Sequence, residues 1–115
     1  MNYWVMPQIN RIRTIEQMLE EICLDLEVPI VKIKSKSRLR ELADKRAILC
    51  YLFYRVLRLN SVATGKLVNR NHATAIVSCY KVEGLLKYPE FQFVKELINK
   101  YKLIKLEDGK ERQDF

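Results

Sequence analysis

The sequence has few of the residues that form tight turns or carry catalytic chemistry. Its 115 residues include only three glycines and three prolines, which argues against an all-β fold rich in turns. It has a single histidine, no Gly-x-Ser-x-Gly or His-Glu-x-x-His motif, and no clustered carboxylates. We therefore expect no catalytic base paired with a nucleophile, no metal site and no cofactor, and we predict that the chain is not an enzyme.

The chain also has no paired cysteines, no long apolar run and, in residues 1–9, no signal-peptide pattern. Cys23, Cys50 and Cys79 are far apart, and each lies in an apolar helical pattern, which predicts buried, reduced thiols. The longest uninterrupted apolar run, residues 47–54, is too short to span a bilayer. Residues 1–9 have neither the basic start nor the apolar block of a signal peptide. These features predict a cytoplasmic protein with no membrane partner and no small-molecule substrate.

Positive charge is abundant and unevenly distributed. The net charge of +7 favours anionic partners such as nucleic acid. Residues 32–46 hold seven cations against two acids, whereas residues 107–115 hold four acids against two bases. This asymmetry predicts a basic working surface and a solvated, mobile acidic tail at residues 107–115.

Helical periodicity dominates the rest of the chain. An apolar stripe from Ile12 to Leu26 recurs at steps of three and four residues, and Pro29 follows it. After an extended loop at 31–37, the pattern predicts helices at 38–59, 62–67 and 72–86 and a last helix opened by Pro89. The sequence thus predicts an all-α fold of about five helices, with an N-terminal arm at residues 1–10 and a single domain at residues 11–106.

Residues 60–86 have the layout of a helix-turn-helix, because a short helix, a polar turn and a longer helix follow one another. Asn71, Thr74 and Ser78 fall on one small, polar face of the second helix. Such a face can approach DNA closely, and residues at the start of the helix can then read base edges. An ordinary N-cap at Asn71 followed by a solvated face fits the same pattern.

The segment Lys34-Ser-Lys-Ser-Arg-Leu-Arg40 combines cations with hydroxyl residues at the entry to the predicted central helix. Arginine in a loop can enter a minor groove, and lysine can contact phosphate as a point charge. Ser37 could instead cap the helix while its neighbours are solvated. A membrane-surface helix is poorly supported, because the apolar half of the predicted helix has the pattern of a buried core.

These segments together resemble the C-terminal, duplex-binding domain of the bacterial replication initiator DnaA, a helix-turn-helix variant related in fold to the Trp repressor. The resemblance covers roughly residues 15–87 and is carried by residues 35–40, 45–50 and 65–77. Where the family commonly has Gly-Gly-Arg-Asp-His-Thr-Thr-Val or Gly-Gly-Arg-Asp-His-Ser-Thr-Val, this chain has Asn-Arg-Asn-His-Ala-Thr-Ala, followed by Ile76. It implies a domain of this type with an additional C-terminal helix.

The resemblance also implies roles for the matched residues. Arg38 matches an arginine of the minor groove, and Asn71, His72 and Ala73 fall where the family reads base edges in the major groove. Together with the basic segment, it predicts two groups of contacts. The base-reading residues would be Arg38, Asn71, His72 and Ala73, and the phosphate-binding residues Lys34, Lys36, Arg40, Lys45, Arg46, Arg70, Thr74 and Ser78.

Three departures from the family pattern concern the turn and the reading residues. The single Asn69 stands in place of paired glycines, Asn71 in place of an acid, and Ala73 in place of a hydroxyl residue. An acid can accept a hydrogen bond from cytosine N4, whereas an asparagine amide suits the N6/N7 pair of adenine, and Ala73 can contact a thymine methyl. We therefore expect a duplex target that differs from the usual box of the family.

The functional expectation is a stand-alone, sequence-specific reader of double-stranded DNA. The sequence contains no Gly-x-x-x-x-Gly-Lys-[Ser/Thr] loop, so ATP-driven activity is not expected of this chain. A small regulatory or replication accessory protein of a bacterium, phage or mobile element fits best, associated with the nucleoid, and its last helix could bind a protein partner. The alternative is a protein–protein interaction or structural module that keeps the helix-turn-helix scaffold without reading DNA. The substitutions at Asn71 and Ala73 favour this alternative. DNA binding is favoured by the joint retention of four residues, which are Arg38, Arg70, His72 and Thr74.

Overall fold

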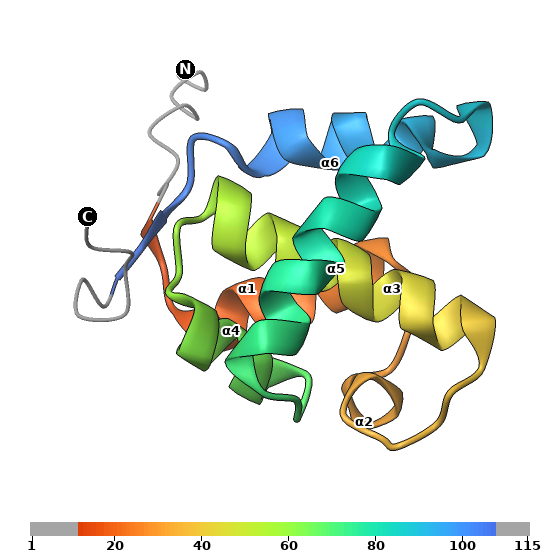
Figure 1. Ribbon diagram of the computed structural model, residues 1–115. Coiled ribbons are helices and arrows are strands. Elements are labelled where there is room, and N and C mark those ends of the chain that lie inside the picture. The colour runs from red at the N-terminus through yellow and green to blue at the C-terminus, as the bar shows by residue number, and fades with distance from the viewer. Residues whose placement is uncertain (1–11, 108–115) are drawn as a thin grey trace.

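Helices build almost all of the domain, and the prediction of an all-α fold is confirmed (Figure 1). The computed structural model describes residues 12–107. Its elements, in chain order, are β1 (Ile12–Arg13), α1 (Ile15–Asp25), α2 (Ile30–Ile33), α3 (Arg40–Tyr51), the π-helical turn η2 (Leu52–Val56), α4 (Ser61–Leu67), α5 (His72–Leu85), the 3-10 turn η3 (Pro89–Phe91), α6 (Gln92–Tyr101) and β2 (Lys105–Leu106). The predicted arm at residues 1–10 and the tail from residue 108 onward lie outside the described residues.

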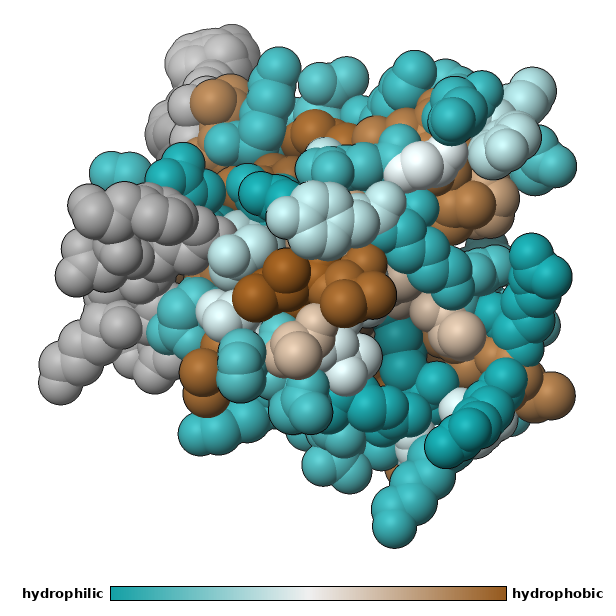
Figure 2. All heavy atoms as spheres, in the orientation of Figure 1, coloured by the Kyte–Doolittle hydropathy of each residue, from teal (hydrophilic) through white to brown (hydrophobic). Residues whose placement is uncertain are grey.

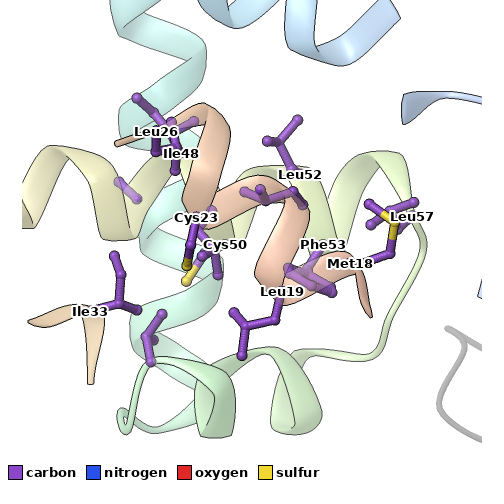
Figure 3. Packing of buried hydrophobic residues seen from close by; sticks show 14 of the residues in the cluster. Met18, Leu19, Cys23, Leu26, Ile33, Ile48, Cys50, Leu52, Phe53 and Leu57 are labelled. Atoms are coloured by element: carbon purple, nitrogen blue, oxygen red, sulfur yellow. The ribbon is translucent and has the colours of Figure 1, made fainter. Parts of the chain in front are cut away.

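The core forms where the apolar faces of the helices meet, as Figure 3 shows for side chains of α1, α3 and η2. Met18 and Ile22 of α1 and Leu49 of α3 are fully buried in it. The three cysteines are free and buried, as the sequence predicts, and burial raises the pKa of Cys50 to about 12. Thiols held this way are neutral at physiological pH and act as small apolar side chains.

Two parts of the expected helix pattern are wrong in detail. Residues 31–37 were expected to be extended, but their first half belongs to the single turn of α2, which follows Pro29 and buries Ile33. The central helix is not one regular α-helix over 38–59. α3 ends at Tyr51, and the next five residues form the wider, π-helical turn η2. There the amide of Leu57 donates to the carbonyl of Leu52 at 2.8 Å, a bond that spans five residues.

The ends of the described chain lie against each other. β1 and β2 pair in parallel, with Ile12 opposite Lys105 (Figure 1). α6 buries Val94 and Tyr101 in the core. The Tyr101 hydroxyl donates to the carboxylate of Asp25 at the end of α1. No helix within residues 12–107 is long and apolar enough to cross a membrane.

Candidate nucleic-acid interface

The turn between α4 and α5 is built by backbone hydrogen bonds that end α4 abruptly. The amide of Asn69 donates to the carbonyl of Lys66 at 3.1 Å, and the amide of Arg70 donates to the carbonyl of Gly65 at 2.8 Å. This pair of bonds is the Schellman motif, which needs a left-handed residue just after the helix. Asn69 takes that conformation with φ of 60°. Asparagine tolerates it better than most residues, so the single Asn69 can turn the chain without a glycine.

Gly65 sets how closely α5 approaches α4. A Cβ atom at this position would lie 2.7 Å from the carbonyl oxygens of both Arg70 and Asn71. Because these are backbone atoms, a larger residue would have to push the start of α5 away. This role of Gly65 is not among the predictions from sequence. A glycine inside a short helical segment just before a turn is the signal that points to such a close approach.

The start of α5 is exposed and capped by Asn71. The Asn71 side-chain oxygen accepts from the backbone amide of Thr74 at 3.0 Å and from the Thr74 hydroxyl at 3.3 Å. Asn71, His72, Ala73 and Thr74 are all exposed, whereas Ala75 is fully buried. Asn71 is therefore a structural cap that also lies at the solvent-facing tip of the helix.

Arg46 lies inside the domain, contrary to the expectation of an exposed phosphate contact. Arg46 is only 7% exposed, and its guanidinium donates hydrogen bonds to backbone carbonyls of residues 32–37. Nε donates to the carbonyl of Ile33 at 2.7 Å, Nη1 to that of Ser37 at 2.8 Å, and Nη2 to those of Ser35 at 2.9 Å and Lys32 at 3.2 Å. Burial and the nearby charge of Arg70 lower the pKa of Arg46, but a guanidinium stays protonated. Arg46 therefore shapes the loop from within the domain.

The turn of the helix-turn-helix and the basic segment, residues 34–40, are joined directly (Figure 1). Arg70 Nη2 donates to the Ser35 carbonyl at 3.1 Å, and Asn69 Nδ2 donates to the Lys34 carbonyl at 3.4 Å. The Ser35 carbonyl thus accepts hydrogen bonds from both Arg46 and Arg70. These contacts fix the start of α5 beside the basic segment, although the two are more than thirty residues apart in sequence.

A cavity of about 340 Å³ opens where the basic segment, α3 and α5 meet. Its wall brings together five residues predicted to contact DNA, which are Arg38, Arg46, Arg70, Thr74 and Ser78. Lys81, one turn beyond Ser78, also lines it and pairs with Asp44 of α3 at 2.9 Å. A recess with cationic and hydroxyl groups on its wall has the chemistry to hold a phosphate group.

The remaining predicted cations divide into two groups. Lys34, Lys36 and Arg40 are exposed, like Arg38. The ammonium group of Lys45 instead has partners within the domain. It forms an ion pair with a carboxylate oxygen of Glu41 at 3.3 Å and donates to the carbonyl oxygen of Glu27 at 3.4 Å. In Figure 2, hydrophilic side chains cover the lower right, over α2 and the chain leading into α3, while apolar atoms gather over the middle of α5. Val77 of α5 is 65% exposed.

Comparison with known proteins places these features in one family. Residues 15–82 match the family described as the bacterial dnaA protein helix-turn-helix. The chain is 30% identical to the chromosomal replication initiator protein DnaA of Bacteroides thetaiotaomicron over 93 residues, which cover 76% of this chain and 20% of that protein. It is also 30% identical to the same protein of Thermodesulfovibrio yellowstonii over 80 residues, 69% of this chain and 18% of that protein. The chain thus spans about a fifth of the length of these relatives. No solved structure matches it significantly.

Proposed function

Because the chain belongs to the bacterial DnaA helix-turn-helix family, we propose that it binds double-stranded DNA in a sequence-specific manner. In this arrangement the start of α5 enters the major groove, and the basic segment lies on the neighbouring backbone with Arg38 in the minor groove. The observation that carries the proposal is the shared hydrogen bonding at Ser35, which holds the two elements on one face.

The proposed contacts fall into two classes. Asn71, His72 and Ala73 read base edges, since they are exposed at the start of α5. Lys34, Lys36 and Arg40 bind phosphates from the basic segment, and the cavity lined by Arg70, Thr74 and Ser78 holds another. Arg46 supports these contacts from within the domain instead of making one.

The proposal assigns DNA reading and no ATP hydrolysis to this sequence, which lacks a phosphate-loop motif. A role as a small regulatory or replication accessory factor follows from that combination. The helix-turn-helix of this chain would then act by occupying a site on the duplex, and any ATP-driven step would belong to another component.

The expected salt dependence of DNA binding follows from the number of phosphates that the protein neutralises. With about six phosphates neutralised, the binding constant should fall roughly a thousandfold between about 50 mM and about 200 mM salt, because condensed counterions are released on binding. We expect sub-micromolar affinity for the preferred duplex at the lower of these concentrations.

Titration of a labelled random duplex pool at the two salt concentrations tests the proposal. Lys36→Ala should weaken binding and reduce the salt slope by about one unit, because Lys36 is an exposed cation of the basic segment proposed to bind phosphate. Lys95→Ala is the matched control, since Lys95 is an exposed cation of α6, away from the proposed face. If no DNA is retained, or if retention does not depend on salt, the protein-interaction alternative is favoured.

A further inference from the structure

The side-chain amide of Asn71 has one end fixed by the helix that it caps. A backbone N–H can only donate a hydrogen bond, so the end of the amide that faces the Thr74 amide must be the oxygen, at 3.0 Å. The Thr74 hydroxyl approaches the same oxygen at 3.3 Å. The oxygen is therefore turned back toward the helix, and the nitrogen occupies the other branch of the planar amide.

The Asn71 nitrogen is the polar atom left for an external partner. It makes no hydrogen bond to any residue of the described part of the chain, and the residue is exposed. The neighbouring arginine does not compete at this point, because Arg70 donates to the carbonyls of Val68, Asn69 and Ser35. At this position the tip of α5 therefore offers a hydrogen-bond donor and no acceptor.

We propose that Asn71 selects against cytosine at the position that it faces in the major groove. The inference rests on the proposed DNA binding and adds to it the chemical class of base that one position excludes. Guanine O6 and N7, thymine O4 and adenine N7 accept hydrogen bonds at the major-groove edge, whereas cytosine offers only the donor N4 there. A donor facing the amino group of cytosine leaves both donors unpaired, so cytosine is disfavoured by about tenfold.

This geometry argues against the two-bond contact between Asn71 and adenine that the sequence suggests. The two-bond adenine contact needs the amide oxygen to accept from N6 while the nitrogen donates to N7. The oxygen of Asn71 is already held by the Thr74 amide. Releasing it would uncap α5, at a cost comparable to the hydrogen bond that would be gained.

Asn71→Asp inverts the chemistry without removing the cap. Aspartate caps helices as well as asparagine does, and one carboxylate oxygen would replace Asn71 Oδ1 opposite the Thr74 amide. The second oxygen would then lie where the amide nitrogen lies now and could only accept. We expect this variant to prefer cytosine or adenine, whose amino groups donate, at the one position where the wild type disfavours cytosine.

The experiment is a parallel selection of bound duplexes from a random library with the wild type and three variants. Asn60→Asp is the matched control, because Asn60 caps α4 through the Ala63 amide at 2.8 Å, so the variant makes the same charge change at a similar cap. It should weaken binding generally and leave the preferred bases unchanged. Asn71→Ser keeps a capping oxygen but removes the amide, and it should lose the preference at that single position.

The outcomes separate this inference from the proposed function. Enrichment of cytosine in Asn71→Asp at the one position where the wild type disfavours it, with loss of that discrimination in Asn71→Ser, supports the inference. An unchanged motif in both variants overturns it while sequence-specific binding stands. If the wild type enriches no motif, the proposed function fails and the inference fails with it. Thermal unfolding of each variant checks that the domain is folded.

Discussion

Replacing Gly65 with alanine is a sensitive test of how the two helices of the helix-turn-helix are held together. Three backbone atoms of Arg70 and Asn71 lie within 3.0 Å of where the new Cβ would be placed. Backbone atoms cannot rotate away, so the start of α5 would have to move as a unit. The opposing term is helix propensity, because Gly65 lies inside α4 and alanine is the better helix former.

Overpacking of this kind costs about 3 kcal/mol, and the propensity gain returns about 1 kcal/mol, so Gly65→Ala should lower the free energy of unfolding by about 2 kcal/mol. For a domain of this size that corresponds to a fall in melting temperature of roughly 10 °C. The displaced residues are also those proposed to meet DNA. Duplex affinity should therefore fall as well, even at temperatures where the variant is fully folded.

Gly84→Ala is the matched control for the same chemical change. Gly84 is exposed in α5, and nothing lies within 4 Å of a Cβ placed there. This variant should gain about 1 kcal/mol from helix propensity alone. Urea and thermal unfolding of the two variants should thus give shifts of opposite sign. Equal shifts, or a stabilised Gly65→Ala variant, would refute the close approach of the two helices.

Three other substitutions test the hydrogen bonds of Arg46 to the basic segment and the contact between Tyr101 of α6 and Asp25 of α1. Arg46→Lys keeps the charge but loses most of the donors to the carbonyls of residues 32–37, so it should lower the free energy of unfolding by about 3 kcal/mol in urea. An unchanged urea midpoint would show that Arg46 does not support the loop. In Tyr101→Phe, loss of the bond to Asp25 should destabilise the domain by about 1 kcal/mol, and a midpoint equal to wild type would contradict this. Burial alone would raise the pKa of Asp25, but hydrogen bonds from Tyr101 and Lys100 lower it below its usual value. Stabilisation by this carboxylate is therefore complete above pH of about 4 and is lost as the pH falls through its folded-state pKa. Asp25→Asn should lower the free energy of unfolding at neutral pH. In strong acid the variant and the wild type should be equally stable, and a difference that persisted there would contradict the lowered pKa of Asp25.

The regular helices could be predicted from sequence because their apolar residues recur with helical spacing. The start of α5 after Asn71 and the helical segment before the turn follow from capping residues and periodicity, and the structure confirms both. α2 could not be predicted this way, since a single turn has no periodicity. The pairing of β1 with β2 joins residues more than ninety positions apart, and two-residue strands leave no pattern in the sequence.

The interior role of Arg46 was beyond local sequence reasoning for a different reason. In a stretch with seven cations, an arginine that points inward has the same sequence signature as one that points to solvent. Only the fold shows that the carbonyls of residues 32–37 converge on one side of α3, where a guanidinium with five donors can satisfy them. The orientation of the Asn71 amide could not be predicted from sequence either, because it depends on which atom of the side chain faces the Thr74 amide.

Amide chemical-shift mapping of the isotope-labelled protein during titration with a short duplex tests the DNA-binding face most directly. The account predicts that the largest changes occur in residues 34–40 and 70–78, with little change in α6. Changes confined to α6 or α1, or none at all at low salt, would contradict the claim that the tip of α5 and the basic segment bind DNA together.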